Sequence, residues 1–231
     1  MNTTLEQNVR EITEERKSVK TVMGGSLAEG ILSGVVVVLS LIGLSGAMPE
    51  AVLSVAAITL GVAFLLEGVT VSTRFSRLLS ETSKSRLDEA ELGAGMTSGF
   101  VAGTTGIVLG ILGLLKISPV ILIPLSVIVF GSALMLSSGL TLRLDNLELE
   151  IYAESTKFKK VAREAMVAAA GVEILLGLGA LVLGIVALTS VYSMTLSLVG
   201  MLTVGITGLA GGAAVTARMV SLFRTEQVDK A

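Results

Sequence analysis

The sequence LAEGILSGVVVVLSLIGLSGA at residues 27–47 is separated from AVLSVAAITLGVAFLLEGVTVST at residues 51–73 by only Met48, Pro49 and Glu50. A helix that crosses the roughly 30 Å hydrocarbon core of a bilayer needs about 20 apolar residues at 1.5 Å per residue. Both stretches meet this requirement, and the short connection forces the chain to turn back on itself. The two stretches therefore predict a membrane-spanning helical hairpin.

The same pattern occurs twice more, at residues 95–115 and 119–142 and at residues 166–189 and 194–217. We therefore predict an all-α fold, a polytopic membrane protein with six transmembrane helices arranged as three hairpins. The predicted single membrane domain covers residues 1–231, with hairpins at 24–77, 91–144 and 165–218, an N-terminal segment at 1–23 and a tail at 219–231.

The three hairpins align with one another as an internal repeat. A shift of 70 residues superimposes the first on the second, and a further 74 superimposes the second on the third. The shared positions include glycine, proline, glutamate and arginine as well as apolar residues: Gly43/Gly113, Pro49/Pro119, Gly61/Gly131/Gly205, Gly103/Gly177, Glu29/Glu173 and Arg74/Arg218.

The composition supports a membrane protein and excludes several classes of site. Hydrophobic residues make up 52% of the chain and charged residues 16%, against about a quarter charged in a soluble domain. The chain has no Cys, His or Trp, which excludes disulfides, thiolate or imidazole metal sites and Ser-His or Cys-His nucleophiles. We expect no cofactor, and the net charge of −2 gives no basis for nucleic-acid binding.

Basic residues predict the orientation. Of the 17 Lys and Arg residues, only Lys116 lies at a hairpin tip, and the others lie in the N-terminal segment, the two linkers between hairpins and the tail. The positive-inside rule then places both termini and both linkers in the cytoplasm. We expect a multi-pass protein of the cytoplasmic (inner) membrane.

The charged cytoplasmic segments carry apolar residues at helical spacing. Leu5, Val9 and Ile12 follow this spacing in the N-terminal segment, and Phe158 and Val161 follow it before the fifth span. Two interpretations remain open: amphipathic helices that lie on the lipid headgroups, or a docking face for a cytoplasmic protein partner.

Small residues line one face of the first helix of each hairpin. Positions spaced 3, 4, 3, 4 and 3 residues apart share a helix face, and such faces let helix backbones pack closely in membranes. Helix–helix packing, through self-association or with other membrane subunits, is one interpretation, and a narrow conduit is the other. The three stripes are Ser26, Glu29, Ser33, Val36, Ser40 and Gly43; Met96, Gly99, Gly103, Gly106, Gly110 and Gly113; and Ala170, Glu173, Gly177, Ala180, Gly184 and Ala187.

Three glutamates form a candidate polar cluster inside the membrane. Glu29 and Glu173 occupy equivalent positions on the stripes, and Glu67 lies on the second helix of the first hairpin. Intramembrane carboxylates face protein or water and are candidates for function. The alternatives are salt bridges at the cytoplasmic rim with Lys20, Arg74, Arg143 or Arg218, a cation or proton site, and a contact with a partner subunit.

The hairpin unit resembles the HdeD-like family of small acid-resistance membrane proteins. The resemblance rests on Gly30-Ile31-Leu32 through Gly43, on Pro49 to Gly61, and on Glu67-Gly68-Val69, and three copies cover residues 30–217. It implies a non-enzymatic inner-membrane protein.

Two functional hypotheses follow from these patterns. The first is a non-catalytic structural or accessory subunit of a homo-oligomer or larger membrane complex. The alternative is a channel or carrier for a small solute or cation that uses the intramembrane glutamates. We do not expect an enzyme, because the sequence shows no convergent set of catalytic residues.

Overall fold

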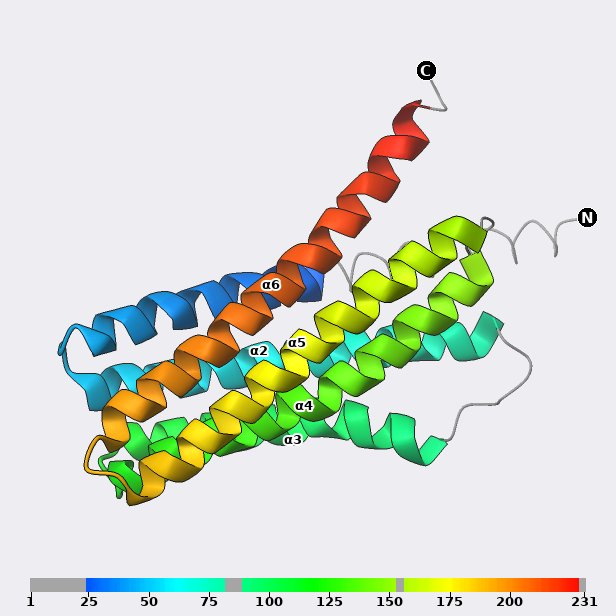
Figure 1. The fold of residues 1–231 in the computed structure, drawn as a ribbon. Coiled ribbons are helices and arrows are strands. Elements are labelled where there is room, and N and C mark those ends of the chain that lie inside the picture. Colours follow the sequence, from blue (N-terminus) through cyan, green and yellow to red (C-terminus); the bar gives the residue numbers. More distant parts are fainter. Residues whose placement is uncertain (1–23, 82–88, 153–155, 229–231) are drawn as a thin grey trace, which may run out of the picture.

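The computed structural model describes residues 24–81, 89–152 and 156–228, and this part of the chain consists of helices joined by turns, with no strand (Figure 1). The predicted segment at 1–23 lies outside it. The first helix covers Gly24–Leu44. It is followed by α2 (Pro49–Glu81), α3 (Glu89–Leu114), α4 (Pro119–Tyr152), α5 (Thr156–Thr189) and α6 (Ser193–Val228).

The prediction of an all-α protein with six membrane-spanning helices is confirmed. Each helix contains a stretch long and apolar enough to cross a bilayer, from Gly24–Leu44 at the start to Ser193–Ala213 at the end. The large apolar side chains that remain exposed fit contact with lipid, for example Val38 at 56%, Leu175 at 67% and Val182 at 48%.

The three hairpin tips lie together at one end of the bundle, and the two ends of the described chain lie toward the other (Figure 1). The first two tips share one turn geometry. Gly46 and Met48 have φ of 92° and 39°, and the aligned Lys116 and Ser118 have φ of 57° and 42°. In each tip, a proline then begins the next helix, where its fixed φ and missing N–H cost nothing.

The exposed tips allow the orientation to be tested in a chain that has no native cysteine. Val191 is 97% exposed at the third tip, and Ser18 lies in the N-terminal segment. We expect Val191→Cys to react with a membrane-impermeant thiol reagent from outside the cell, and Ser18→Cys to react only in inverted vesicles. Labelling of both variants from the same side would contradict the predicted topology.

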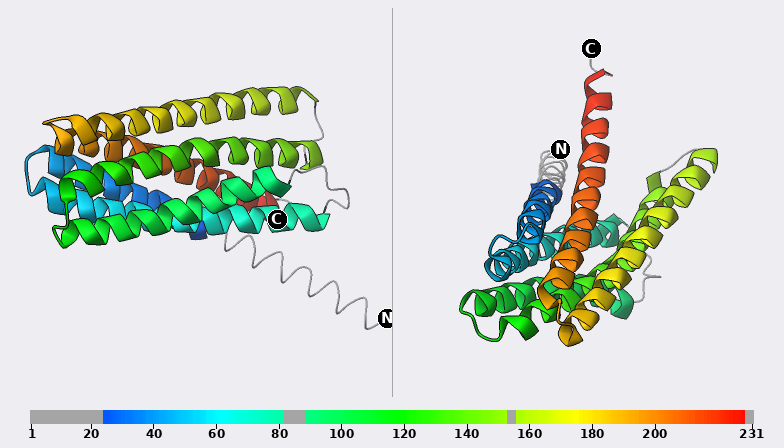
Figure 2. Two further views of the ribbon diagram at one scale, coloured as in Figure 1. Left: turned by 90° about the horizontal axis from the view of Figure 1, so that it is seen from below. Right: turned by 60° about the vertical axis from the view of Figure 1, so that its left-hand side comes forward.

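The helices extend further into the charged segments than the sequence analysis predicted. Phe158 and Val161, predicted to belong to an amphipathic cytoplasmic helix before the fifth span, are in the first part of α5, which runs unbroken to Thr189. Likewise, α6 includes most of the predicted tail. The physical reason is that residues 157–169, KFKKVAREAMVAA, contain good helix formers and neither Gly nor Pro. Figure 2 shows α4 and α5 running side by side.

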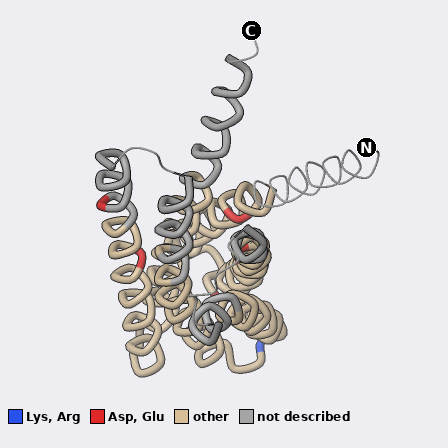
Figure 3. Tube along the Cα trace, turned by 90° about the vertical axis from the view of Figure 1, so that its right-hand side faces the viewer, with Lys and Arg blue, Asp and Glu red and all other residues tan. Residues whose placement is uncertain are grey.

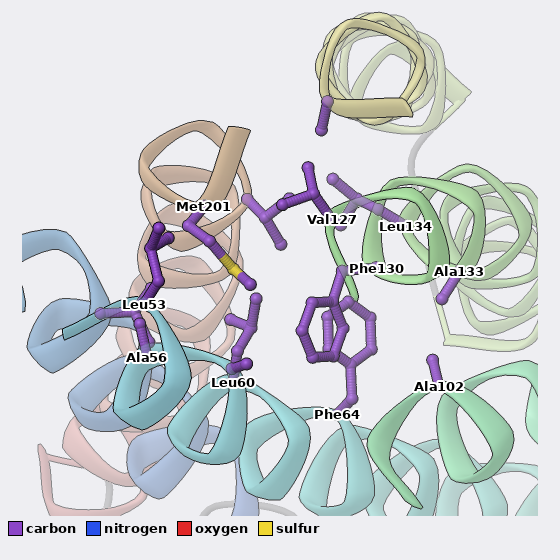
Figure 4. Close-up of a cluster of buried hydrophobic side chains, with 14 of the residues drawn as sticks. Leu53, Ala56, Leu60, Phe64, Ala102, Val127, Phe130, Ala133, Leu134 and Met201 are labelled. Atoms are coloured by element: carbon purple, nitrogen blue, oxygen red, sulfur yellow. The ribbon is translucent and has the colours of Figure 1, made fainter. Parts of the chain in front are cut away.

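The second helices of the three hairpins form the centre of the bundle. α2, α4 and α6 each contact the other two, whereas α3 contacts α2 and α4, and α5 contacts α4 and α6. Between them, apolar side chains pack into one core (Figure 4). The rings of Phe64 and Phe130 stack with centroids 5.3 Å apart, and Leu60 and Met201 close the space beside them.

Neighbouring hairpins meet through backbone-to-backbone contacts at glycines. A Cβ atom added to Gly61 of α2 would lie 2.6 Å from the carbonyl oxygen of Gly103 in α3. At the aligned positions, a Cβ atom added to Gly131 of α4 would lie 2.7 Å from the carbonyl oxygen of Gly177 in α5. Any side chain at these positions would push the two helices apart.

The first helix closes the bundle against α6 at the corresponding positions. A Cβ atom added to Gly205 would lie 3.3 Å from the carbonyl oxygen of Ser33, and one added to Gly212 would lie 2.7 Å from the Cα atom of Gly30. Gly205 aligns with Gly61 and Gly131 in the repeat. The third hairpin therefore packs on the first hairpin through positions that align with those by which the first hairpin packs on the second.

Candidate acidic pocket

A pocket of about 100 Å³ lies inside the bundle, in the half of the spans nearer the chain termini. It is bordered by the first helix and by α2, α4, α5 and α6. Its polar lining consists of Ser26, Glu29, Ser33, Glu67, Thr70, Ser137, Glu173 and Thr207. A polar space of this size has room for several water molecules.

The three glutamates predicted as a cluster all line this pocket. Glu29 comes from the first helix, Glu67 from α2 and Glu173 from α5, and each side chain is half-buried. Their carboxyl groups lie close enough to interact electrostatically. The helices that carry them are otherwise almost free of charged residues over the described spans, as the sparse coloured segments of Figure 3 show.

The pocket lies where equivalent positions of the three predicted repeats converge. Glu67 aligns with Ser137 and Gly211, and all three line the pocket. Ser137 also hydrogen-bonds to Glu67 through its hydroxyl group. Gly99, which aligns with Glu29 and Glu173, does not line the pocket. It packs on α2, where an added Cβ atom would lie 3.3 Å from the Phe64 carbonyl oxygen.

The floor of the pocket is apolar. Leu60, Phe64, Leu134 and Val204 line it, and all four are buried. Leu60 precedes Glu67 by two helical turns, so the apolar floor lies about 10 Å from the acidic level along the helix axis at 1.5 Å per residue. The pocket is therefore acidic at one level and hydrophobic at the other.

The tip-side half of the bundle is closed beneath this floor. Leu53 of α2, Ile123 and Val127 of α4, and Met201 of α6 are all at most 1% exposed. These side chains belong to the same packed cluster. No pocket-lining residue comes from the tip-side end of any span, so the pocket ends in the middle of the bundle.

One of the pocket hydroxyls, that of Ser33, lies against a glycine of α6. Most hydroxyls in these spans bond back to a carbonyl oxygen three or four residues earlier, as Thr207 does to Thr203 at 2.8 Å. Ser33 is 1% exposed and lines the pocket. A side chain on Gly208, another lining residue, would meet this hydroxyl, so it points toward the α6 wall.

The predicted packing stripes separate from this pocket over most of their length. Ser40, Gly43, Gly103, Gly106, Gly110, Gly113, Gly177, Ala180 and Gly184 are buried against neighbouring helices, and none of them lines the pocket. Gly106, for example, lies against the ring of Phe130, whose Cε1 atom would be 2.6 Å from an added Cβ atom. Ser33 belongs to the first stripe and also lines the pocket.

The acidic cluster does not form a chelating metal site. Among the described residues, no three acidic side chains are placed closely enough to hold a metal ion. The side chains of the predicted rim partners Lys20, Arg74, Arg143 and Arg218 lie outside the described part of the structure. The described lining contains acids and hydroxyls and no basic residue.

Several polar lining residues could not be predicted from the sequence, namely Thr70, Ser137 and Thr207. Hydroxyl residues are common in membrane helices and usually bond to their own backbone, so the type of residue alone gives no signal. The repeat does give one for Ser137, because it aligns with Glu67. Thr207 aligns with Ala63, which also lines the pocket, and the two could have been paired in this way.

Comparison of the chain with protein-family models, with curated proteins and with solved structures finds no match, and the resemblance to HdeD-like proteins stays a prediction.

Proposed function

We propose that this integral membrane protein is a non-catalytic carrier that binds a small cation in its acidic pocket. The observation that supports this most strongly is the convergence of Glu29, Glu67 and Glu173, from three different helices, on one space inside the membrane-spanning bundle. Carboxylates are costly inside a bilayer and are retained where they face water, a partner charge or a transported ion. Hydroxyls complete a lining that suits a positively charged ligand.

A carrier fits the pocket better than an open channel does. A channel needs a continuous polar path, whereas the packed residues Leu53, Ile123 and Met201 close the bundle on the tip side. A ligand would enter the pocket from the terminal side, which the positive-inside rule places in the cytoplasm of an inner-membrane protein. Release on the opposite side would require the hairpins to move against one another.

The second candidate is an accessory subunit of a homo-oligomer or larger complex. The tip-side half of the bundle is filled by packed side chains, and this favours an accessory subunit. A bundle that never opens cannot carry a solute. In this case the glutamates would meet a partner subunit or a basic side chain at the rim, and the charged helix extensions would offer a surface to a cytoplasmic partner. The triplicated hairpin would then serve assembly alone.

Uptake into vesicles separates the two candidates. The purified protein is reconstituted into liposomes, and influx of protons, ammonium, Na⁺ or K⁺ is followed with an ion-sensitive dye against protein-free liposomes. We expect influx of at least one cation above the protein-free rate, with saturation at high concentration because a finite number of pockets is filled. Protein-free rates for every cation would instead favour the accessory subunit.

A further inference from the structure

The contact between the first helix and α6 is looser toward the hairpin tips than the two contacts that correspond to it. A Cβ atom added to Gly205 of α6 would lie 3.3 Å from the Ser33 carbonyl oxygen, whereas the aligned glycines of α2 and α4 give 2.6 Å and 2.7 Å. Further toward the tips, the predicted repeat aligns Ser40 with Gly110 and Gly184. Cβ atoms added to these two glycines would lie 2.7 Å and 3.0 Å from carbonyl oxygens of α2 and α4. A serine cannot pack as closely as these glycines do.

The other end of the same contact, nearer the chain termini, is tight. A Cβ atom added to Gly212 of α6 would lie 2.7 Å from the Gly30 Cα atom and 2.8 Å from the Ser26 carbonyl oxygen. The Ser26 hydroxyl also donates a 3.2 Å hydrogen bond to the Gly212 carbonyl oxygen. The α2–α3 contact has the opposite gradient, because the nearest α2 backbone atom would lie 3.3 Å from a Cβ atom on Gly99 and 2.7 Å from one on Gly110. The first helix is therefore held to α6 at one end only.

Two fully buried hydroxyl groups lie at the loose end without a hydrogen-bond partner in the described part of the chain. They belong to Ser40 of the first helix and Ser197 of α6, and both residues are 0% exposed. Ser40 lies on its stripe between Val36 and Gly43, which both lie against α6, and Ser197 precedes Leu198, which lies against Gly43. A buried hydroxyl without a partner destabilises the state that buries it. The closed tip half is therefore a state that water would relieve.

We propose that the tip-side half of the first helix swings away from α6 about the Gly30–Gly212 contact, and that this movement opens the tip side of the bundle. Small residues often form the hinges of such movements. The short tip at residues 45–48 keeps the end of the first helix beside α2, so the helix separates from α6 alone. Water then reaches the Ser40 and Ser197 hydroxyls and supplies their missing hydrogen bonds. This inference rests on the proposed carrier function, for which it names the contact that moves.

The reaction of buried thiols measures this opening without any transport assay. The chain has no native cysteine, and Ser40→Cys and Ser54→Cys each replace a fully buried hydroxyl by a thiol. Ser54 lies in the tip half of α2, against Gly113 of α3. We expect methyl methanethiosulfonate to modify Ser40→Cys in liposomes at least tenfold faster than Ser54→Cys, because only the first thiol lies at the contact that opens. Equal rates for the two thiols would overturn the inference.

A disulfide across the moving contact tests whether the opening serves transport. Gly43→Cys/Leu198→Cys joins the first helix to α6, where a Cβ atom on Gly43 would meet the Leu198 side chain. The predicted repeat aligns this pair with Gly113→Cys/Ser54→Cys across α2–α3, where a Cβ atom on Gly113 would lie 3.4 Å from the Ser54 Cβ atom, close to disulfide geometry. We expect oxidation of the first pair to lower the influx of protons, ammonium, Na⁺ or K⁺ into liposomes at least tenfold, with recovery after reduction. Oxidation of the second pair should leave influx unchanged.

The two measurements separate the failure of this inference from the failure of the proposed function. Undiminished influx in the oxidised Gly43→Cys/Leu198→Cys protein would overturn the inference and leave the carrier standing. Protein-free influx rates for the unmodified protein would overturn the carrier. The relative thiol rates of Ser40→Cys and Ser54→Cys would then still decide whether the first helix separates from α6.

Discussion

Gly61→Leu should lower the free energy of unfolding by about 3 kcal/mol, at or beyond the upper end of the usual overpacking range. A Cβ atom at this position would lie 2.6 Å from the Gly103 carbonyl oxygen and 2.9 Å from the Ile107 backbone nitrogen. Both atoms belong to the α3 backbone, so no side-chain rotation relieves the clash and the two helices must separate. Reversible unfolding by SDS, followed by circular dichroism, measures the change.

The aligned Gly131→Leu should have an effect of similar size, since its added Cβ atom would lie 2.7 Å from backbone atoms of Gly177 and Leu181. Gly179→Leu is the control, because this glycine is exposed on α5 with open space around it, and it should unfold as the unmodified protein does. Equal stability of Gly61→Leu and Gly179→Leu would show that the hairpins do not meet through the α2–α3 backbone contact.

The membrane-spanning architecture could be predicted from the sequence because it depends on simple, local quantities. Length and apolar content determine which segments cross a bilayer, and the prolines at 49 and 119 mark where two of the returning helices begin. Small-residue spacing identified the faces that bury against other helices. The helix ends were the weakest part, because the charged extensions of α4, α5 and α6 contain no residue that stops a helix.

The acidic pocket could be predicted only in part. Glu29 and Glu173 stood out because the predicted repeat places both on the small-residue face, and Glu67 stood out as a charge inside a span. The role of the first helix in the pocket could not be derived, because it depends on the last hairpin closing on the first through Gly205 and Gly212. Contacts between residues so far apart in the chain leave no local pattern in a single sequence.

The roles of the serines also required the structure. Ser33 and Ser40 share one stripe, seven residues apart, and appear equivalent in sequence. In the structure Ser33 lines the pocket, whereas Ser40 is fully buried among packed helices and its hydroxyl has no hydrogen-bond partner in the described chain. The two serines differ only in depth: Ser33 lies at the level of the pocket, whereas Ser40 lies where Leu53, Ile123 and Met201 close the bundle.

The double variant Glu29→Gln/Glu173→Gln should abolish cation binding while leaving the protein folded. Each charge-assisted hydrogen bond contributes about 1.5–3 kcal/mol, so the loss of two carboxylates should weaken binding by roughly a hundredfold or more. Glutamine keeps the shape and most of the hydrogen bonding of glutamate. Since the two carboxylates lie in one pocket with Glu67, removing their charges also removes like-charge repulsion, and we expect equal or higher thermal stability without ligand.

A charge-matched control is available on the same chain. Glu50 lies at the first hairpin tip and Glu164 near the beginning of α5, and both are exposed and outside the pocket. Glu50→Gln/Glu164→Gln changes the net charge by the same amount as the pocket variant. Any effect of net charge alone, on the detergent complex or on weak surface binding of cations, will appear in both proteins.

The thermal unfolding midpoint as a function of cation concentration, in the unmodified protein and these two double variants, tests the existence of the cation pocket most directly. A ligand that binds only the folded state raises the midpoint as its concentration increases. We predict that at least one of ammonium, Na⁺ and K⁺ raises the midpoint of the unmodified protein and of Glu50→Gln/Glu164→Gln, and leaves that of Glu29→Gln/Glu173→Gln unchanged. An equal rise in all three proteins, or no rise with any of the three cations, would contradict the assignment of the acidic pocket as a cation site.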